Sequence, residues 1–199
     1  MNSSSLPKNI SKFWKQISSF EFTRLRLLDA DSSVMLLTSL IVGICSGVGA
    51  VLFRNLIDWL QNLAYQDISG LMQEYYPLHL ILIPAIGGAF VGPLVYYFAR
   101  EAKGHGVPEV MESLELRGGR IRPRVVVVKS LASSICIASG GSVGREGPIA
   151  QIGSALGSIV GQVLKLSDDR VRTLVACGAA GGIAATFNAP IAGAVFALE

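Results

Sequence analysis

The sequence has few charged residues, and this shortage separates it from most soluble proteins. Asp, Glu, Lys and Arg make up 16% of the 199 residues, whereas soluble domains average about 25%. The formal net charge is only +3, and the basic residues form no dense patch of the kind that binds nucleic acid. Together with a hydrophobic fraction of 51%, the low charge indicates a membrane protein.

Cysteine and histidine are also scarce, and their positions do not suggest a metal centre. The three cysteines, Cys45, Cys136 and Cys177, lie in apolar segments and form no Cys-x-x-Cys or Cys/His cluster. We interpret them as small buried hydrophobic residues. We therefore expect no metal site and no cofactor.

Two long uncharged runs, residues 34–53 and 77–99, are each long enough to cross a bilayer as a helix. The first has 20 residues, which extend about 30 Å at 1.5 Å per residue, the thickness of one hydrocarbon core. Residues 61–76, between the runs, have two acids and no Lys or Arg, whereas the N-terminus and residues 100–124 are basic. Because basic loops stay in the cytoplasm, we expect both basic segments on the cytoplasmic side.

Beyond residue 124 the apolar segments are short or interrupted. They are residues 125–139, residues 147–164 and residues 173–198. A polar stretch separates the second from the third, and we expect Gly181 and Gly182, and then residues 188–190, to interrupt the third. This pattern predicts an all-α fold of tilted and broken membrane helices, with which transporters build substrate sites near the midplane.

Glycines four residues apart recur in the apolar segments, where they let helices approach one another closely. We expect close helix packing at Gly43 and Gly47, at Gly88 and Gly92, at Gly153, Gly157 and Gly161, and at Gly178 and Gly182.

The chain divides at about residue 31 into a polar N-terminal segment (1–31) and a membrane domain (32–199). Apolar residues recur at helical spacing in the first segment, at Ile10, Phe13, Trp14, Ile17 and Phe20. This spacing predicts a cytoplasmic amphipathic helix on the membrane surface; an unstructured tail is the alternative. The segment lacks the apolar core of a signal peptide.

Two glycine-flanked breaks, GHGVP at residues 104–108 and GREGP at residues 144–148, place a proline where a helix begins. Proline suits the first turn because its missing N–H would have no partner there. The unpaired amides and the positive end of the helix dipole form an anion site. Backbone amides hold a small anion loosely enough for it to leave again.

Glu146 lies within the second break, and its carboxylate can itself occupy an anion site at a helix N-terminus. Once protonated, it would tolerate a neighbouring anion, so one side chain both competes with the anion and carries a proton. A first-turn acid that only stabilises its helix is the simpler interpretation. At membrane depth, and with a second matching helix end, we favour the functional role. We interpret Arg145 as structural.

The letters GGSVG at residues 140–144 also match the nucleophile motif of hydrolases around Ser142. Such a motif requires a preceding strand and an acid and a histidine that follow it. The only histidines, His79 and His105, precede Ser142, and no strand pattern leads into it. We therefore do not expect an enzyme.

Three linked motifs resemble the ClC family of chloride channels and chloride/proton antiporters, in its N-terminal half. They are GHGVPEVMESLELRGGRIRPR, GGSVGREGPIAQIG and GAAGGIAATFNAPIAGAVFALE. The resemblance implies the first repeat of an inverted-repeat membrane fold, with chloride as the substrate, and a homodimer. The implied anion-selectivity filter is Gly104, His105, Gly106, Val107, Pro108, Gly144, Arg145, Glu146, Gly147 and Pro148. Glu146 matches the gating glutamate, which relays protons in the antiporters.

This chain departs from the family pattern at three points. His105 replaces a serine whose hydroxyl usually reaches the anion. Two interpretations of His105 stay open: it contacts the anion, or it is a turn histidine that binds no ligand. The second repeat, with its anion-contacting tyrosine, is missing, so we expect the chain to be part of a longer product. Glu199 aligns with the first residue of an acidic pair whose second residue carries protons in the antiporters, so channel and antiporter both stay open.

We expect a multi-pass protein of a bacterial inner membrane, with a cytoplasmic N-terminus. Our leading hypothesis is transport of chloride or a similar small anion, gated by Glu146 and coupled to protons. The alternatives are a secondary transporter of another anion and an incomplete, inactive part of a pore.

Overall fold

The structure is a computed structural model that describes residues 30–67, 79–98 and 106–198. Within these ranges every regular element is a helix, which confirms the expected all-α fold. The chain forms two compact units, Met1–Leu36 and Leu37–Glu199. The predicted amphipathic helix of the N-terminal segment lies outside the described residues.

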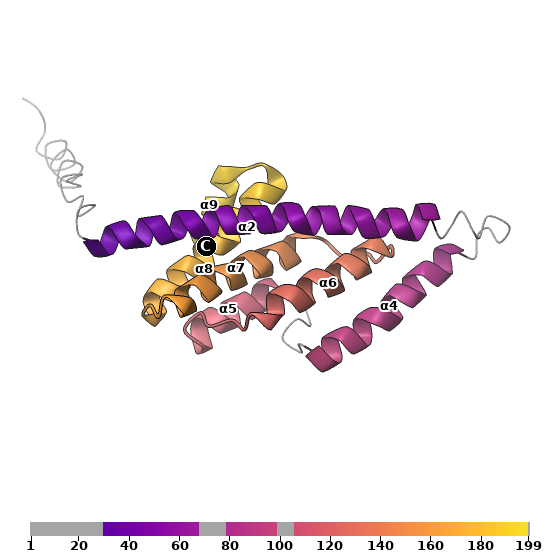
Figure 1. Cartoon of the computed structure of the whole chain (residues 1–199), viewed down its shortest axis with the longest axis horizontal. Helices are drawn as coiled ribbons and strands as arrows, with labels where there is room; N and C mark the ends of the chain where they lie inside the picture. The colour runs from indigo at the N-terminus through magenta and orange to yellow at the C-terminus, as the bar shows by residue number, and fades with distance from the viewer. Residues whose placement is uncertain (1–29, 68–78, 99–105, 199) are drawn as a thin grey trace, which may run out of the picture. The chain divides into compact units, whose positions relative to one another are not determined.

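Figure 1 labels the helices of the described residues. In chain order they are α2 (Ala30–Asn62), continued by the π-helix η2 (Leu63–Asp67), then α4 (His79–Phe98), α5 (Val107–Leu116), α6 (Arg124–Ala138), α7 (Glu146–Val163), α8 (Asp168–Phe187) and α9 (Pro190–Leu198).

Two helical segments, Ser33–Gln66 and Ile81–Phe98, are long and apolar enough to cross a membrane by length and composition. They coincide with the two long uncharged runs of the sequence. Many of their apolar side chains are more than half exposed, among them Leu40, Ile44, Val48, Leu52, Ile81, Ile86, Phe90 and Phe98. Apolar surface on this scale is unusual for a protein in water and suits contact with lipid.

Helices α7 and α8 form the most extensive helix pair, and they lie side by side in Figure 1. One buried cluster joins α5, α6, α7 and α8 through Val110, Ile121, Val125, Ala155, Val171 and Val175. A second cluster packs α2 on α7 through Ala50, Phe53, Ile57, Ile149 and Ile152. Helix α7 is therefore covered on several sides, and its N-terminal end is held by the core.

Glycine brings α7 and α8 close together, as the spacing predicted. A Cβ added to Gly153 would collide with the carbonyl group of Gly178, and one added to Gly157 would collide with that of Leu174. Any larger side chain at these positions would force the two backbones apart. Gly43, Gly88 and Gly92 differ from the prediction, because a Cβ at each of them would meet nothing within 4 Å in the described part of the chain.

One of the two predicted interruptions of the last apolar segment is wrong. Helix α8 runs without a break through Gly181 and Gly182, because both glycines are packing positions. A Cβ on Gly182 would lie 3.0 Å from the side chain of Ile149. The second interruption is confirmed: α8 ends at Phe187, and Asn188 caps it in the left-handed conformation with φ 53°.

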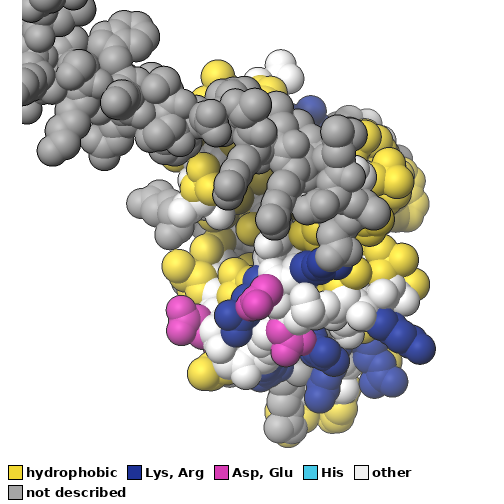
Figure 2. Space-filling view, turned by 90° about the vertical axis from the view of Figure 1, so that its left-hand side faces the viewer, with side chains coloured by type: hydrophobic (Ala, Val, Ile, Leu, Met, Phe, Trp, Pro, Cys, Tyr) yellow, Lys and Arg dark blue, Asp and Glu magenta, His cyan; other side chains and the backbone are white. Residues whose placement is uncertain are grey.

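Basic side chains gather where the α5–α6 and α7–α8 connections meet, and Figure 2 shows Lys and Arg together on one face. Seven basic residues lie in these two connections or in the first turns of the helices that follow them: Arg117, Arg120, Arg122, Arg124, Lys165, Arg170 and Arg172. Arg120 pairs with Asp168 across the two connections at 2.9 Å. The buried hydroxyl of Ser158, on α7, also holds the α5–α6 connection, since it donates to Gly119 O at 2.6 Å and accepts from Ile121 N at 2.8 Å.

Candidate anion-binding site at two helix N-termini

The two glycine-flanked breaks come together at the N-termini of α5 and α7. Gly106 has φ +97°, a conformation that L side chains rarely adopt. A Cβ added to Gly106 would lie 2.5 Å from the carbonyl oxygen of Gly147. The absence of a side chain at Gly106 therefore permits direct backbone contact between the two helix ends. Gly104 and His105 lie outside the described residues.

Each helix begins as its proline predicts. Pro108 is the second residue of α5 and Pro148 the third residue of α7. The first backbone hydrogen bonds within these helices are donated by Val110 N and by Ile149 N. Helix geometry thus leaves the amides of Val107 and Glu109 in α5, and of Glu146 and Gly147 in α7, without a partner inside their own helix.

The amide of Gly106 is not open to an anion in this structure, contrary to the simplest expectation from the sequence. The side chain of Glu109 folds back over the first turn of α5, and its Oε2 accepts the Gly106 N–H at 2.8 Å. An acid three residues after a helix cap often makes this bond. Sequence reasoning missed Glu109, although its place directly after Pro108 was a usable signal.

A buried lysine stands behind this carboxylate. Lys129, on α6, is 4% exposed, and it interacts electrostatically with Glu109. A charged lysine is seldom buried without a partner. Glu109 thus accepts the Gly106 amide at the start of α5 and lies near enough to Lys129 for their charges to influence each other. In the sequence, Lys129 is the one charged residue within the apolar segment 125–139.

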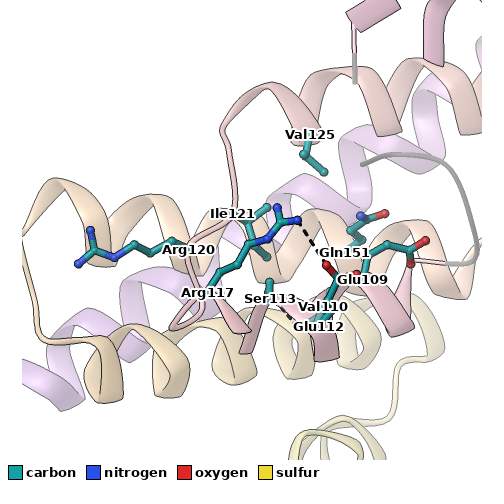
Figure 3. Close-up of a pocket in the computed structure, with 9 residues that line it drawn as sticks. All are labelled: Glu109, Val110, Glu112, Ser113, Arg117, Arg120, Ile121, Val125 and Gln151. Carbon is teal, nitrogen blue, oxygen red and sulfur yellow. Dashed lines mark hydrogen bonds and ion pairs between the residues drawn. The ribbon is translucent and has the colours of Figure 1, made fainter. Parts of the chain in front are cut away.

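A small cavity of about 70 Å³ lies beside α5 and extends from Glu109 to the basic residues Arg117 and Arg120. Glu109 and Gln151 line one side, and Glu112, Ser113 and Arg117 line another (Figure 3). The guanidinium group of Arg117 pairs with Glu112 at 3.3 Å. The space is large enough to hold water. Sequence spacing gave no sign of this cavity, because its walls come from three helices.

Glu146 is the first residue of α7, and its side chain is exposed, like that of Arg145. The Glu146 carboxylate bends back over Gly144, where any added Cβ would collide with it. Gly144 therefore leaves room for this carboxylate to lie beside the start of its own helix. A carboxylate at that position is stabilised by the positive end of the helix dipole.

The arrangement concentrates positive potential in one place. Two helix N-termini touch at Gly106 and Gly147, and the only titratable side chain at the start of α7 besides Arg145 is Glu146. Paired N-termini attract a small anion through amides and dipoles. A carboxylate beside them competes for the same potential, and protonation removes that competition.

Comparison with known proteins agrees with this geometry. The family model described as voltage gated chloride channel matches residues 87–199, which is more than half of the chain. The chain is 36% identical over 186 residues to the H(+)/Cl(-) exchange transporter ClcA of Klebsiella pneumoniae, and 35% identical over 172 residues to the putative chloride channel protein ClcB-like of Ralstonia nicotianae. These alignments cover 87% and 83% of this chain, but only 38% and 40% of the two relatives.

Two solved structures share the fold. A slow cyanobacterial Cl-/H+ antiporter superposes with a TM-score of 0.68 at 28% identity, over 80% of this chain and 38% of the antiporter. A CLC-type fluoride/proton antiporter superposes with a TM-score of 0.67 at 26% identity, over 84% of this chain and 40% of that protein. The chain thus spans about two fifths of the length of the relatives it matches.

Proposed function

Because this chain belongs to the voltage-gated chloride channel family, we propose that the protein it is part of moves chloride or a similar small anion across a membrane in exchange for protons. One observation carries the proposal: the N-termini of α5 and α7 touch at Gly106 and Gly147, with Glu146 at the start of α7. The matched relatives named as Cl-/H+ exchangers support the same assignment.

In this proposal the anion binds near the amides that start α5 and α7. Gly104, His105, Gly106, Val107 and Pro108 would form one wall, and Gly144, Arg145, Glu146, Gly147 and Pro148 the other. The deprotonated carboxylate of Glu146 occupies the region of positive potential at the helix N-termini and keeps the anion out of it. Protonation neutralises the carboxylate, so an anion can enter, and the proton leaves when the carboxylate returns.

The proposed orientation places the basic end, at the α5–α6 and α7–α8 connections, in the cytoplasm of a bacterium. Positive loops stay on that side of a membrane, and the same rule places the N-terminus there. We also propose that the full protein is a homodimer, which mass photometry of the protein in detergent micelles measures directly.

Flux measurements on the full-length protein in liposomes test the proposal. Glu146→Gln mimics the protonated side chain but cannot release a proton, so we expect chloride flux to continue while coupled proton movement stops. Glu115→Gln changes an exposed acid on α5 and serves as the matched control. Proton movement that is unchanged in the Glu146→Gln protein would contradict the assigned role of Glu146.

The identity of the anion needs a separate test, because one matched antiporter carries fluoride by its title. Chloride and fluoride efflux from the same liposomes would separate the two substrates. A His105→Ser variant tests whether this side chain contributes to the choice. A preference for an organic anion over both halides would favour the second candidate, a secondary transporter of a different anion.

A further inference from the structure

The turn between α6 and α7 is held from outside by the end of α2. Tyr65, in the π-helix η2, donates its hydroxyl hydrogen to the carbonyl oxygen of Ser139 at 3.1 Å. The next residue, Gly140, has φ +92°, and a Cβ there would lie 2.6 Å from the Tyr65 oxygen. The tyrosine therefore bonds to one residue of the turn and fills the space beside the next.

Helix α4 closes the same turn from another side. A Cβ added to Gly87 would lie 2.5 Å from the Cβ of Ser139, and Pro84 reaches within 3.8 Å of a Cβ added to Gly140. Ser139 is 7% exposed, and its own hydroxyl donates to Cys136 O at 3.1 Å. The beginning of the α6–α7 connection is thus buried and tightly surrounded.

The end of the connection is different. Local bonds run only as far as Val143, whose N–H donates to Gly141 O at 2.8 Å. Residues 142–146 are all exposed, and Glu146 is the last of them. The segment that carries Glu146 is therefore fixed at its start and open at its end.

We propose that Tyr65 is a positioning residue for Glu146, acting through the carbonyl group of Ser139. The inference rests on the proposed function, since it concerns how well the Glu146 carboxylate is seated at the N-terminus of α7. Its physical basis is that only five residues separate Gly140 from Glu146, and glycines at 140, 141 and 144 give this short connection unusual backbone freedom. A fixed start limits where such a flexible segment can place its end.

A π-helical turn fits this role. Single π turns are rare and occur frequently at functional sites. Here the π turn Leu63–Asp67 follows the longest helix in the described part of the chain and includes Tyr65. Phenylalanine lacks only the hydroxyl group of tyrosine, so Tyr65→Phe removes the bond to Ser139 and keeps the ring.

The experiment measures chloride efflux from liposomes with the full-length protein and its Tyr65→Phe variant. Tyr97→Phe is the matched control, because that ring is 77% exposed on α4. When the carboxylate of Glu146 is seated less firmly, it blocks the anion less often. We expect Tyr65→Phe to raise chloride efflux by about two- to ten-fold, the range set by one neutral hydrogen bond, and Tyr97→Phe to leave it unchanged.

The same two substitutions are then made in the Glu146→Gln protein, where no carboxylate remains to be seated. There we expect Tyr65→Phe and Tyr97→Phe to give equal chloride efflux. A merely structural tyrosine would change efflux by the same factor in both backgrounds, and that result would overturn the inference. Hydrogen exchange at the amides of Gly141 and Val143 gives a readout independent of transport, and we expect it to be faster in Tyr65→Phe.

The outcomes separate the two proposals. If Glu146→Gln alters transport while Tyr65→Phe matches Tyr97→Phe, the role of Tyr65 is wrong and the proposed function stands. If Glu146→Gln changes neither chloride nor proton movement, the proposed function fails, and the positioning role fails with it. Unchanged hydrogen exchange in Tyr65→Phe would also overturn the inference, because the turn would then not depend on the hydroxyl.

Discussion

Replacing Gly106 by alanine tests whether contact between the two helix ends builds the site. The new methyl group would lie 2.5 Å from the carbonyl oxygen of Gly147, whereas ordinary contact begins at 3.4 Å. The two ends would have to separate by 3.4 − 2.5 = 0.9 Å, unless the backbone at Gly106 changes its conformation. Either response removes the close approach of α5 and α7.

Two costs add up in the Gly106→Ala protein. The backbone has φ +97°, where a residue with a side chain is strained by about 1–3 kcal/mol. Overpacking against Gly147 adds about 1–3 kcal/mol. If the anion loses one of the two helix ends, its binding weakens by about 0.5–2 kcal/mol, which corresponds to a two- to thirty-fold loss of affinity.

Thermal unfolding in detergent and chloride-binding calorimetry of the full-length protein measure these two effects. Gly88→Ala is the control, because a methyl group there would meet nothing within 4 Å in the described residues. We expect Gly88→Ala to leave the Tm and the chloride affinity unchanged, and Gly106→Ala to lower both. Equal behaviour of the two variants would refute the view that close contact at Gly106 forms the site.

Two further substitutions test the supports around the site. Ser158→Ala removes a buried hydroxyl that donates to Gly119 O and accepts from Ile121 N. Since each buried group left unpaired costs about 1–3 kcal/mol, we expect a denaturant titration to show a free energy of unfolding lower by about 2–5 kcal/mol. A change below 1 kcal/mol would show that water replaces the hydroxyl. Glu109→Gln replaces the charged acceptor of the Gly106 amide by a neutral one. We expect the same titration to show a free energy of unfolding lower by about 1–2 kcal/mol. An unchanged free energy of unfolding would mean that the carboxylate does not stabilise the start of the helix.

Much of the fold could be predicted from local chemistry. The helix starts at Pro108 and Pro148 follow from a property of proline itself, which has no N–H to leave unpaired in a first turn. The close packing at Gly153 and Gly178 follows from the absence of a side chain. The end of α8 before Asn188 likewise reflects the tolerance of this residue for the left-handed conformation.

The features that the sequence did not reveal depend on contacts between distant residues. In the sequence, Gly181 is compatible with either a helix break or a close helix contact. The structure shows the contact, because α2 lies beside Gly181. Lys129 looks like a charge that interrupts an apolar run, until Glu109 on another helix is placed near it. The bond from Tyr65 to Ser139 joins residues 74 positions apart, a separation over which no local pattern operates.

Anomalous diffraction from bromide bound to crystals of the full-length protein tests the central claim most directly. In the Glu146→Gln protein no carboxylate competes for the positive potential at the start of α7. We expect a bromide ion within hydrogen-bond distance of a backbone amide at the N-terminus of α5 or α7, more highly occupied in the variant than in the unmutated protein. Bromide bound elsewhere, with none at either helix end, would contradict it.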